Sequence, residues 1–310
     1  MKKIGLVFPG QGSQYVGMGK DLYDRSAAAR EVFQEANEAL GWDIAALCFQ
    51  GPEEELKLTA KTQPAILTTA IAALRVIQVE REFIPGVAAG HSLGEYGALI
   101  TSGGLLFADA VRLVHLRGKF MQEAVPVGTG AMAAVMGMTG PEVENLCQEA
   151  AQGEVLSPAN YNCPGQIVIA GHVTAVHRAS AIVAKQGGKK TVLLPVSAPF
   201  HCALMKPAAE RLAEALAKVA VEDLHTPVLS NAEADFYPGK EKIREILVKQ
   251  VDHPVRWEEC MQKLLATGVN LVLEVGPGKV LCGLMRKINR EIKMANVEDG
   301  PSWEKAQQLL

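Results

Sequence analysis

The sequence of 310 residues lacks a long uninterrupted apolar run. A membrane-spanning helix needs about 20 consecutive apolar residues, whereas the first apolar stretch, Ile4 to Phe8, ends at Pro9-Gly10. That stretch is also too short for the apolar region of a signal peptide. We therefore expect a cytoplasmic globular protein, for which 48% hydrophobic and 21% charged residues are ordinary values.

Closely spaced cysteines are absent as well. The six cysteines are scattered along the chain, and no two of them form a Cys-x-x-Cys pair. We expect them to be reduced and mostly buried. His172 and His177 lack nearby cysteine or carboxylate partners, so a zinc site is not expected.

The chain also lacks the marks of nucleic-acid and nucleotide binding. Its formal net charge of −3 argues against nucleic acid as a partner. The glycines between Gly10 and Gly19 do not fit the pattern Gly-x-Gly-x-x-Gly. Gly276-Pro277-Gly278-Lys279 is followed by Val280, where a phosphate-binding loop requires Ser or Thr. Nucleotide-phosphate enzymes are therefore not expected.

What the sequence does contain is the segment Gly90-His91-Ser92-Leu93-Gly94, a Gly-x-Ser-x-Gly pattern. The apolar run 87–89 precedes it, and apolar residues at helical spacing follow it over 96–100. Strand, glycine-bounded turn and helix together are the setting of a serine nucleophile. A purely structural turn in an α/β protein is the alternative.

Strands and helices alternate along most of the chain, which predicts a parallel sheet with helices on both of its faces. The apolar periodicity predicts strands at 3–8, 87–89 and 270–274, and helices at 27–40, 62–80, 92–100, 107–124, 203–219, 241–250 and 279–290.

The middle of the chain has a different order of elements. Strands are expected at 131–136, 155–160, 166–170 and 191–195, with helices at 141–151 and 172–185. This β-α-β-β-α-β order is that of a ferredoxin-like unit. The expected fold is therefore α/β: a large α/β-hydrolase-like subdomain with a central parallel sheet, residues 1–125 and 197–310, and an inserted ferredoxin-like small subdomain, residues 126–196.

A serine nucleophile needs a base, most often histidine. His201 lies in Pro199-Phe200-His201, directly after the last strand of the insertion, where sites in α/β proteins often lie. His91 adjoins Ser92 in the sequence, but the side chains of neighbours on a sharp turn usually point apart, so His91 is only the alternative base. The histidines at 115, 172, 177 and 225 are expected to serve packing or to lie at the surface.

Several segments, taken in order, resemble a known family: Phe8-Pro9-Gly10-Gln11-Gly12-Ser13-Gln14, Gly90-His91-Ser92-Leu93-Gly94-Glu95-Tyr96, Arg117-Gly118-Lys119-Phe120-Met121-Gln122, Asn160-Tyr161-Asn162-Cys163-Pro164-Gly165-Gln166 and Pro199-Phe200-His201. The chain is similar over nearly its whole length to malonyl-CoA:acyl-carrier-protein transacylases and the related acyltransferase domains of fatty-acid and polyketide synthases.

The resemblance implies a catalytic role for five residues. Ser92 would be the acylated nucleophile and His201 its base. The backbone carbonyl of Gln250 would orient His201, with the carboxylate of Asp252 as the alternative. The backbone N–H groups of Gln11 and Leu93 would form the oxyanion hole, unless Gln11 is a plain turn residue.

The resemblance also implies substrate contacts. Arg117 would bind the free carboxylate of the malonyl group, since a guanidinium suits a bidentate carboxylate; a surface arginine is the alternative. Met121 and Phe200 would wall the acyl pocket, with core packing as the alternative. Asn160, Asn162 and Gln166 would line the thioester and pantetheine cleft, with an ordinary turn at Asn162-Cys163-Pro164-Gly165 as the alternative for Asn162.

The resemblance further implies transfer of malonyl from malonyl-CoA to acyl carrier protein in fatty-acid biosynthesis, without cofactor or metal. Carrier proteins of this kind are acidic, so a basic docking patch is expected. The candidates are a cluster in the insertion (Lys185, Lys189, Lys190) and one near the C-terminus (Lys279, Arg286, Lys287, Arg290, Lys293). A thioesterase or lipase-like hydrolase and a non-catalytic carrier-binding module are the rival functions.

Overall fold

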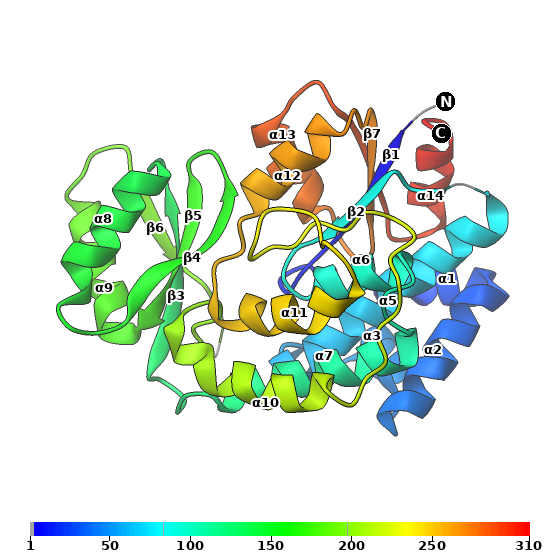
Figure 1. Cartoon of the computed structure of the whole chain (residues 1–310), viewed down its shortest axis with the longest axis horizontal. Helices are drawn as coiled ribbons and strands as arrows, with labels where there is room; N and C mark the ends of the chain where they lie inside the picture. The colour runs from blue at the N-terminus through cyan, green and yellow to red at the C-terminus, as the bar shows by residue number, and fades with distance from the viewer. Residues whose placement is uncertain (1–2, 83, 197) are drawn as a thin grey trace.

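The chain forms two separate β-sheets (Figure 1). The computed structural model describes residues 3–82, 84–196 and 198–310. The first sheet has the order β2-β1-β7-β8, and its neighbouring strands are all parallel. Its strands are β1 (Ile4–Phe8), β2 (Val87–Gly90), β7 (Leu271–Val275) and β8 (Lys293–Val297).

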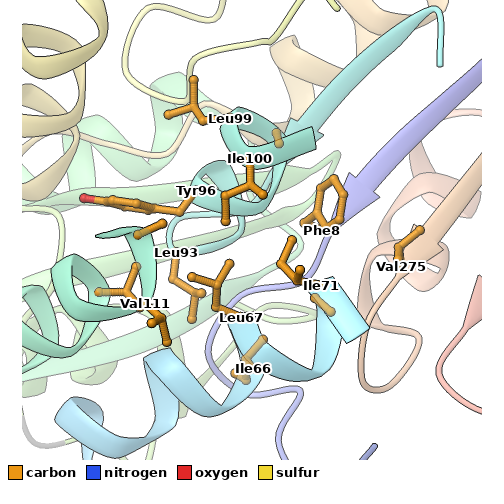
Figure 2. Close-up of a cluster of buried hydrophobic side chains, with 14 of the residues drawn as sticks. Phe8, Ile66, Leu67, Ile71, Leu93, Tyr96, Leu99, Ile100, Val111 and Val275 are labelled. Carbon is orange, nitrogen blue, oxygen red and sulfur yellow. The ribbon is translucent and has the colours of Figure 1, made fainter. Parts of the chain in front are cut away.

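Both faces of the parallel sheet are buried. Leu6 and Phe8 of β1 pack in one apolar cluster, whereas Val7 between them packs in another on the opposite face. The first face is covered by α5 (Thr59–Glu80), α6 (Gly94–Thr101) and α7 (Phe107–Glu123), and the second by α12 (Trp257–Ala266) and α13 (Val280–Ile288). Figure 2 shows Phe8 at the end of β1 among side chains of α5 and α6. This packing explains why β1, β2 and β7 read as largely apolar runs.

The remaining helices surround this core. They are α1 (Lys20–Arg25), α2 (Ala27–Leu40), α3 (Ile44–Gln50), α4 (Glu53–Leu56), α10 (Lys206–Leu216), α11 (Ile243–Asp252) and α14 (Gly300–Gln307), with 3₁₀ turns at Ala203–Met205 and Lys240–Lys242. All six cysteines are buried and unpaired, as expected. Within the described residues, none of the helices combines the length and the apolar character needed to cross a bilayer.

The second sheet is antiparallel and has the order β4-β5-β3-β6. It contains β3 (Gly130–Met136), β4 (Leu156–Cys163), β5 (Gln166–His172) and β6 (Lys190–Leu193), with α8 (Gly140–Ala151) and α9 (Val173–Ala184) packed on it. In chain order this is β-α-β-β-α-β, with the third strand between the first and second. Both sheets of the expected α/β fold are therefore present.

Side chains of β3 alternate between two environments. Ala133 and Val135 pack against α8 and α9, whereas Met132 and Ala134 belong to the main core cluster of the large unit. The antiparallel sheet thus presents one face to its own helices and the other to the large unit. We propose the division expected from the sequence, with a small subdomain at 126–196; Ser197, at the second boundary, lies outside the described residues.

Some elements differ from the sequence-based expectation. β4 continues through Cys163 because β-bulges maintain its pairing, and the turn shortens to Pro164-Gly165. The expected helix 203–219 is a 3₁₀ turn followed by α10. The short helices α1, α3 and α4, and β8, α12 and α14, were not expected. β8 is an edge strand in which only Val297 is fully buried, so no apolar run marks it.

Candidate active site

Ser92 lies on a sharp turn between β2 and α6 with a φ of 52°, a strained value for a residue with a side chain. The glycines of the motif make this turn possible. A Cβ atom on Gly90 would lie 1.9 Å from the carbonyl carbon of Gly94, and one on Gly94 would lie 2.1 Å from the Phe8 oxygen. Strand and helix therefore approach each other at a distance that only glycine allows.

His201 is hydrogen-bonded to Ser92. Its Nε2 lies 2.7 Å from Ser92 Oγ, and its Nδ1 lies 2.8 Å from the backbone oxygen of Gln250. Because a carbonyl only accepts, Nδ1–H donates to it and Nε2 is left to accept the serine proton. Burial and the nearby Arg117 cation lower the pKa of His201 to about 3, so the ring is neutral at physiological pH.

His91, the alternative base, and Asp252, the alternative orienting group, have other hydrogen-bond partners. The carboxylate of Asp252 is 2.6 Å from Nδ1 of His253, the next residue, and not from His201. His91 Nε2 lies 2.9 Å from Asn162 Oδ1, and its ring packs against that of Trp257. Geometry therefore pairs Ser92 with His201 and His201 with the Gln250 carbonyl.

Asn231, which was not among the expected site residues, holds the serine turn. Its Oδ1 accepts from the Ser92 N–H at 2.6 Å, and its Nδ2 donates to the Gly90 oxygen at 2.8 Å. Val228, just before it, bridges in parallel to Ala88 of β2. In the sequence, the apolar pair Val228-Leu229 followed by the polar pair Ser230-Asn231 is the pattern of a short buried strand and its polar end. This end lies beside Ser92.

Arg117 of α7 is buried, with 1% of its surface exposed. Its Nη1 donates to Gln63 Oε1 at 2.8 Å, and its Nη2 donates to Ser92 Oγ at 3.0 Å and to Gln250 Oε1 at 2.8 Å. The Nε–H is buried without a hydrogen-bond partner among the described residues. A surface role for Arg117 is excluded, and its guanidinium keeps unused donors at Nε and in the second hydrogen of Nη1.

A cavity of about 100 Å³ opens beside Ser92, between the two sheets. It is smaller than the roughly 150 Å³ cavity that accommodates benzene in other proteins, so it suits an acyl group of a few heavy atoms. Its lining residues are Gln11, Gln63, His91, Ser92, Leu93, Arg117, Met121, Met132, Asn160, Leu194, Val196, Phe200 and His201.

The structure brings most of the expected site residues to this cavity, but not all. Gln250 lies behind it, and its contacts reach both His201 and Arg117. Asn162 is outside the lining and contacts His91. Gln166 is also outside, at the β4–β5 hairpin, where its Oε1 accepts from Lys287 Nζ at 3.0 Å.

Comparison with known proteins agrees with this geometry. A family model described as "Acyl transferase domain" matches residues 6–308. The chain belongs to the acyl transferase domain family. The resemblance stated from the sequence motifs is thus confirmed, and the chain is an acyltransferase.

Individual relatives of this acyltransferase are similar over almost their full length. The malonyl CoA-acyl carrier protein transacylase of Escherichia coli (strain K12) is 51% identical over 288 residues, 93% of each chain. The crystal structure of the transacylase of the same name from Xanthomonas oryzae has a TM-score of 0.97 and 43% identity, covering 100% of this chain and 98% of that one. A second structure, a malonyl-transacylase in complex with its type II PKS acyl-carrier protein, has a TM-score of 0.96 and 45% identity, covering 99% of this chain and 100% of that one.

Proposed function

We propose that this acyltransferase moves a malonyl group from malonyl-CoA to the pantetheine thiol of acyl carrier protein, in fatty-acid biosynthesis. The names of the similar proteins support this substrate and partner. The observation that carries the proposal is a buried arginine beside the serine hydroxyl. Arg117 Nη2 and His201 Nε2 both contact Ser92 Oγ, at 3.0 and 2.7 Å, in a small cavity. A cation there suits a short acyl group that ends in a carboxylate.

In the first half-reaction, Ser92 Oγ attacks the thioester carbonyl while His201 Nε2 accepts the hydroxyl proton. The oxyanion of the tetrahedral intermediate would face the backbone N–H groups of Leu93 and Gln11. Leu93 is the N-cap of α6, so its N–H is free of intrahelical bonding. His201 then gives its proton to the departing coenzyme A thiolate, which leaves a malonyl ester on Ser92.

In the second half-reaction, the carrier's pantetheine thiol gives its proton to His201 and attacks the ester carbonyl. Collapse of the second tetrahedral intermediate releases malonyl-pantetheine, and the proton returns to Ser92 Oγ. The donor, malonyl-CoA, and the acceptor, the carrier's thiol, use one site in turn, so the kinetics are ping-pong. The Gln250 carbonyl keeps the His201 tautomer fixed in both steps, because it holds the Nδ1 proton.

Mass measurement after incubation with malonyl-CoA tests this proposal. We expect a stable adduct of one malonyl group, located on the peptide that contains Ser92, and its loss when acyl carrier protein is added. A hydrolase would give only a transient adduct, and a carrier-binding module would give none. Either result would contradict the proposed transfer.

The two basic clusters differ in their ion pairs. Lys189 of the insertion is paired with Glu142, at 2.8 Å. The cations of the C-terminal cluster are exposed and, within the described residues, form no salt bridge with a carboxylate. Lys287 on α13 contacts Gln166, so this cluster adjoins the small sheet. We propose it as the docking surface for an acidic carrier protein, because it offers five exposed cations without a salt bridge among the described residues, against two, Lys185 and Lys190, in the insertion.

Charge reversal at two positions of this surface tests the docking. The double variant Arg286→Glu/Lys287→Glu should raise the KM for carrier protein by about tenfold or more and leave malonyl loading from malonyl-CoA intact. The matched control is Lys185→Glu/Lys190→Glu, which reverses two exposed charges of the other cluster. Equal loss in both half-reactions, or the larger KM effect in the control, would reject the C-terminal surface.

A further inference from the structure

Glu95 is a fully buried carboxylate one helical turn from the nucleophile. Its Oε2 accepts from the Asn231 N–H at 2.9 Å and from Gln250 Nε2 at 2.8 Å, and its Oε1 accepts from the hydroxyl of Tyr237. All three partners donate, which suits the ionised, acceptor-only form of the carboxyl group. None of them carries a positive charge, so Glu95 has no direct ion pair.

The side chain of Gln250 connects this carboxylate to Arg117. Gln250 Oε1 accepts from Arg117 Nη2 at 2.8 Å, while Gln250 Nε2 donates to Glu95 Oε2 and to the Ser92 oxygen, at 2.8 and 2.9 Å. The amide cannot be reversed, because its NH₂ group would then face the guanidinium. A buried cation and a buried carboxylate therefore share one amide, and each favours the charged form of the other.

We propose that Glu95 is the resident counter-charge of Arg117 and limits how strongly the site prefers an acyl group with a carboxylate. This inference rests on the proposed function, in which Arg117 binds the malonyl carboxylate. With Glu95 ionised, the incoming carboxylate meets a cation whose field is partly cancelled. With Glu95 neutral, it meets the uncompensated cation. Glu95 is thus a specificity-determining residue that acts through Gln250, not a catalytic one.

The charge of Glu95 changes within the range of a pH experiment. Burial raises the pKa of Glu95 to about 7. The titratable groups that face it are Tyr237, Tyr96 and Cys260, and burial raises the pKa of each. These three stay neutral and Arg117 stays charged between pH 6 and 8, while His201, with a pKa of about 3, stays uncharged. Among these groups, Glu95 is the one that titrates in this window.

The variant Glu95→Gln removes the charge and retains the hydrogen bonds. Its amide oxygen can accept from Asn231 and Gln250, and its NH₂ can donate to the Tyr237 hydroxyl, which can accept. The measurement is the ratio of kcat/KM for malonyl-CoA to that for acetyl-CoA in forming the acyl-serine adduct. At pH 8 we expect this ratio to rise about tenfold over that of the unmodified chain. The ratio cancels the titration of groups common to both reactions.

The pH profile is the second readout. In the unmodified chain the malonyl-to-acetyl ratio should rise as the pH falls from 8 to 6, as Glu95 takes up a proton, whereas in Glu95→Gln it should stay constant. Tyr237→Phe removes a hydrogen bond that lowers the pKa of Glu95, so it should shift the midpoint of this rise to higher pH. The control is Glu274→Gln, the same change at a buried carboxylate that accepts from the Leu281 and Cys282 N–H groups; its ratio should not change.

The inference is overturned if folded Glu95→Gln keeps the ratio and the pH dependence of the unmodified chain. If that variant does not fold, an unshifted midpoint in Tyr237→Phe overturns it. Failure of the proposed function has a different signature: the unmodified chain forms no malonyl adduct, or Arg117→Ala keeps the original ratio. A normal adduct and a ratio lost in Arg117→Ala but unchanged in Glu95→Gln would reject the role of Glu95 alone.

Discussion

Replacing Ser92 by alanine should abolish acyl-adduct formation, with transfer reduced by about 10⁴-fold or more, because a methyl group cannot attack a thioester. Rapid-quench mass spectrometry with malonyl-CoA measures this directly. Ser102→Ala is the control, because it makes the same substitution at a buried serine whose hydroxyl donates to the Leu99 oxygen and which does not line the cavity. A retained malonyl adduct in Ser92→Ala would place the nucleophile elsewhere.

His201→Ala should slow acylation by about 10⁴–10⁶-fold, since the hydroxyl then has no base at 2.7 Å. His115→Ala is its control, because His115 also contacts a backbone oxygen through Nδ1, that of Ala60, but lies outside the cavity lining.

The lowered pKa of His201, about 3, also predicts that acylation by the unmodified chain does not decline between pH 8 and pH 5. A decline centred near 6.5 would mean that the base has an unperturbed pKa.

A third large effect is expected at Arg117. Arg117→Ala would leave a malonyl carboxylate without a cation in a largely desolvated site, which costs about 2–5 kcal/mol, or roughly 30- to 4,000-fold in kcat/KM for malonyl-CoA. Acetyl-CoA has no such charge. The contact of Nη2 with Ser92 Oγ affects both acyl groups alike, so the malonyl-to-acetyl ratio is the informative quantity.

Arg117→Lys should restore only part of this ratio, because an ammonium group cannot make the two-pronged contact. Arg112→Ala on the same helix is the control; Arg112 is half-exposed and pairs with Asp109. Equal losses for malonyl-CoA and acetyl-CoA in folded Arg117→Ala would assign Arg117 a structural role and leave the carboxylate without its proposed partner.

The local structure around the nucleophile was predictable from sequence because its causes are local. Gly90 and Gly94 flank Ser92 at a spacing that only a tight strand-to-helix turn uses, and the apolar run before them is a strand buried on both faces. The β-α-β-β-α-β order of the insertion was likewise visible in the order of apolar segments. Element ends were less certain, as with β4, where bulges decided how far pairing continues.

The partners of each side chain depended on residues far away in the sequence. Ser92 and His201 are 109 residues apart, and Arg117 and Gln250 are 133 apart. The resemblance to a family suggested the first pair and the Gln250 carbonyl. Gln250 has a second role, in which its side-chain amide joins Arg117 to Glu95. The sequence carries no signal for this role, because a glutamine reads the same whether its amide is buried in a hydrogen-bond network or exposed to solvent.

The sequence by itself thus determined the strands other than the edge strand β8, the serine turn and the division into two sheets, since apolar periodicity and glycine spacing act within a few residues. Only the tertiary structure decided that Arg117 is buried, that Asn231 holds the turn, and that Asn162 and Gln166 lie outside the cavity. The reason is physical. Burial and hydrogen-bond partners of a polar side chain are fixed by how sheets and helices pack, and this packing sums contacts from the whole chain.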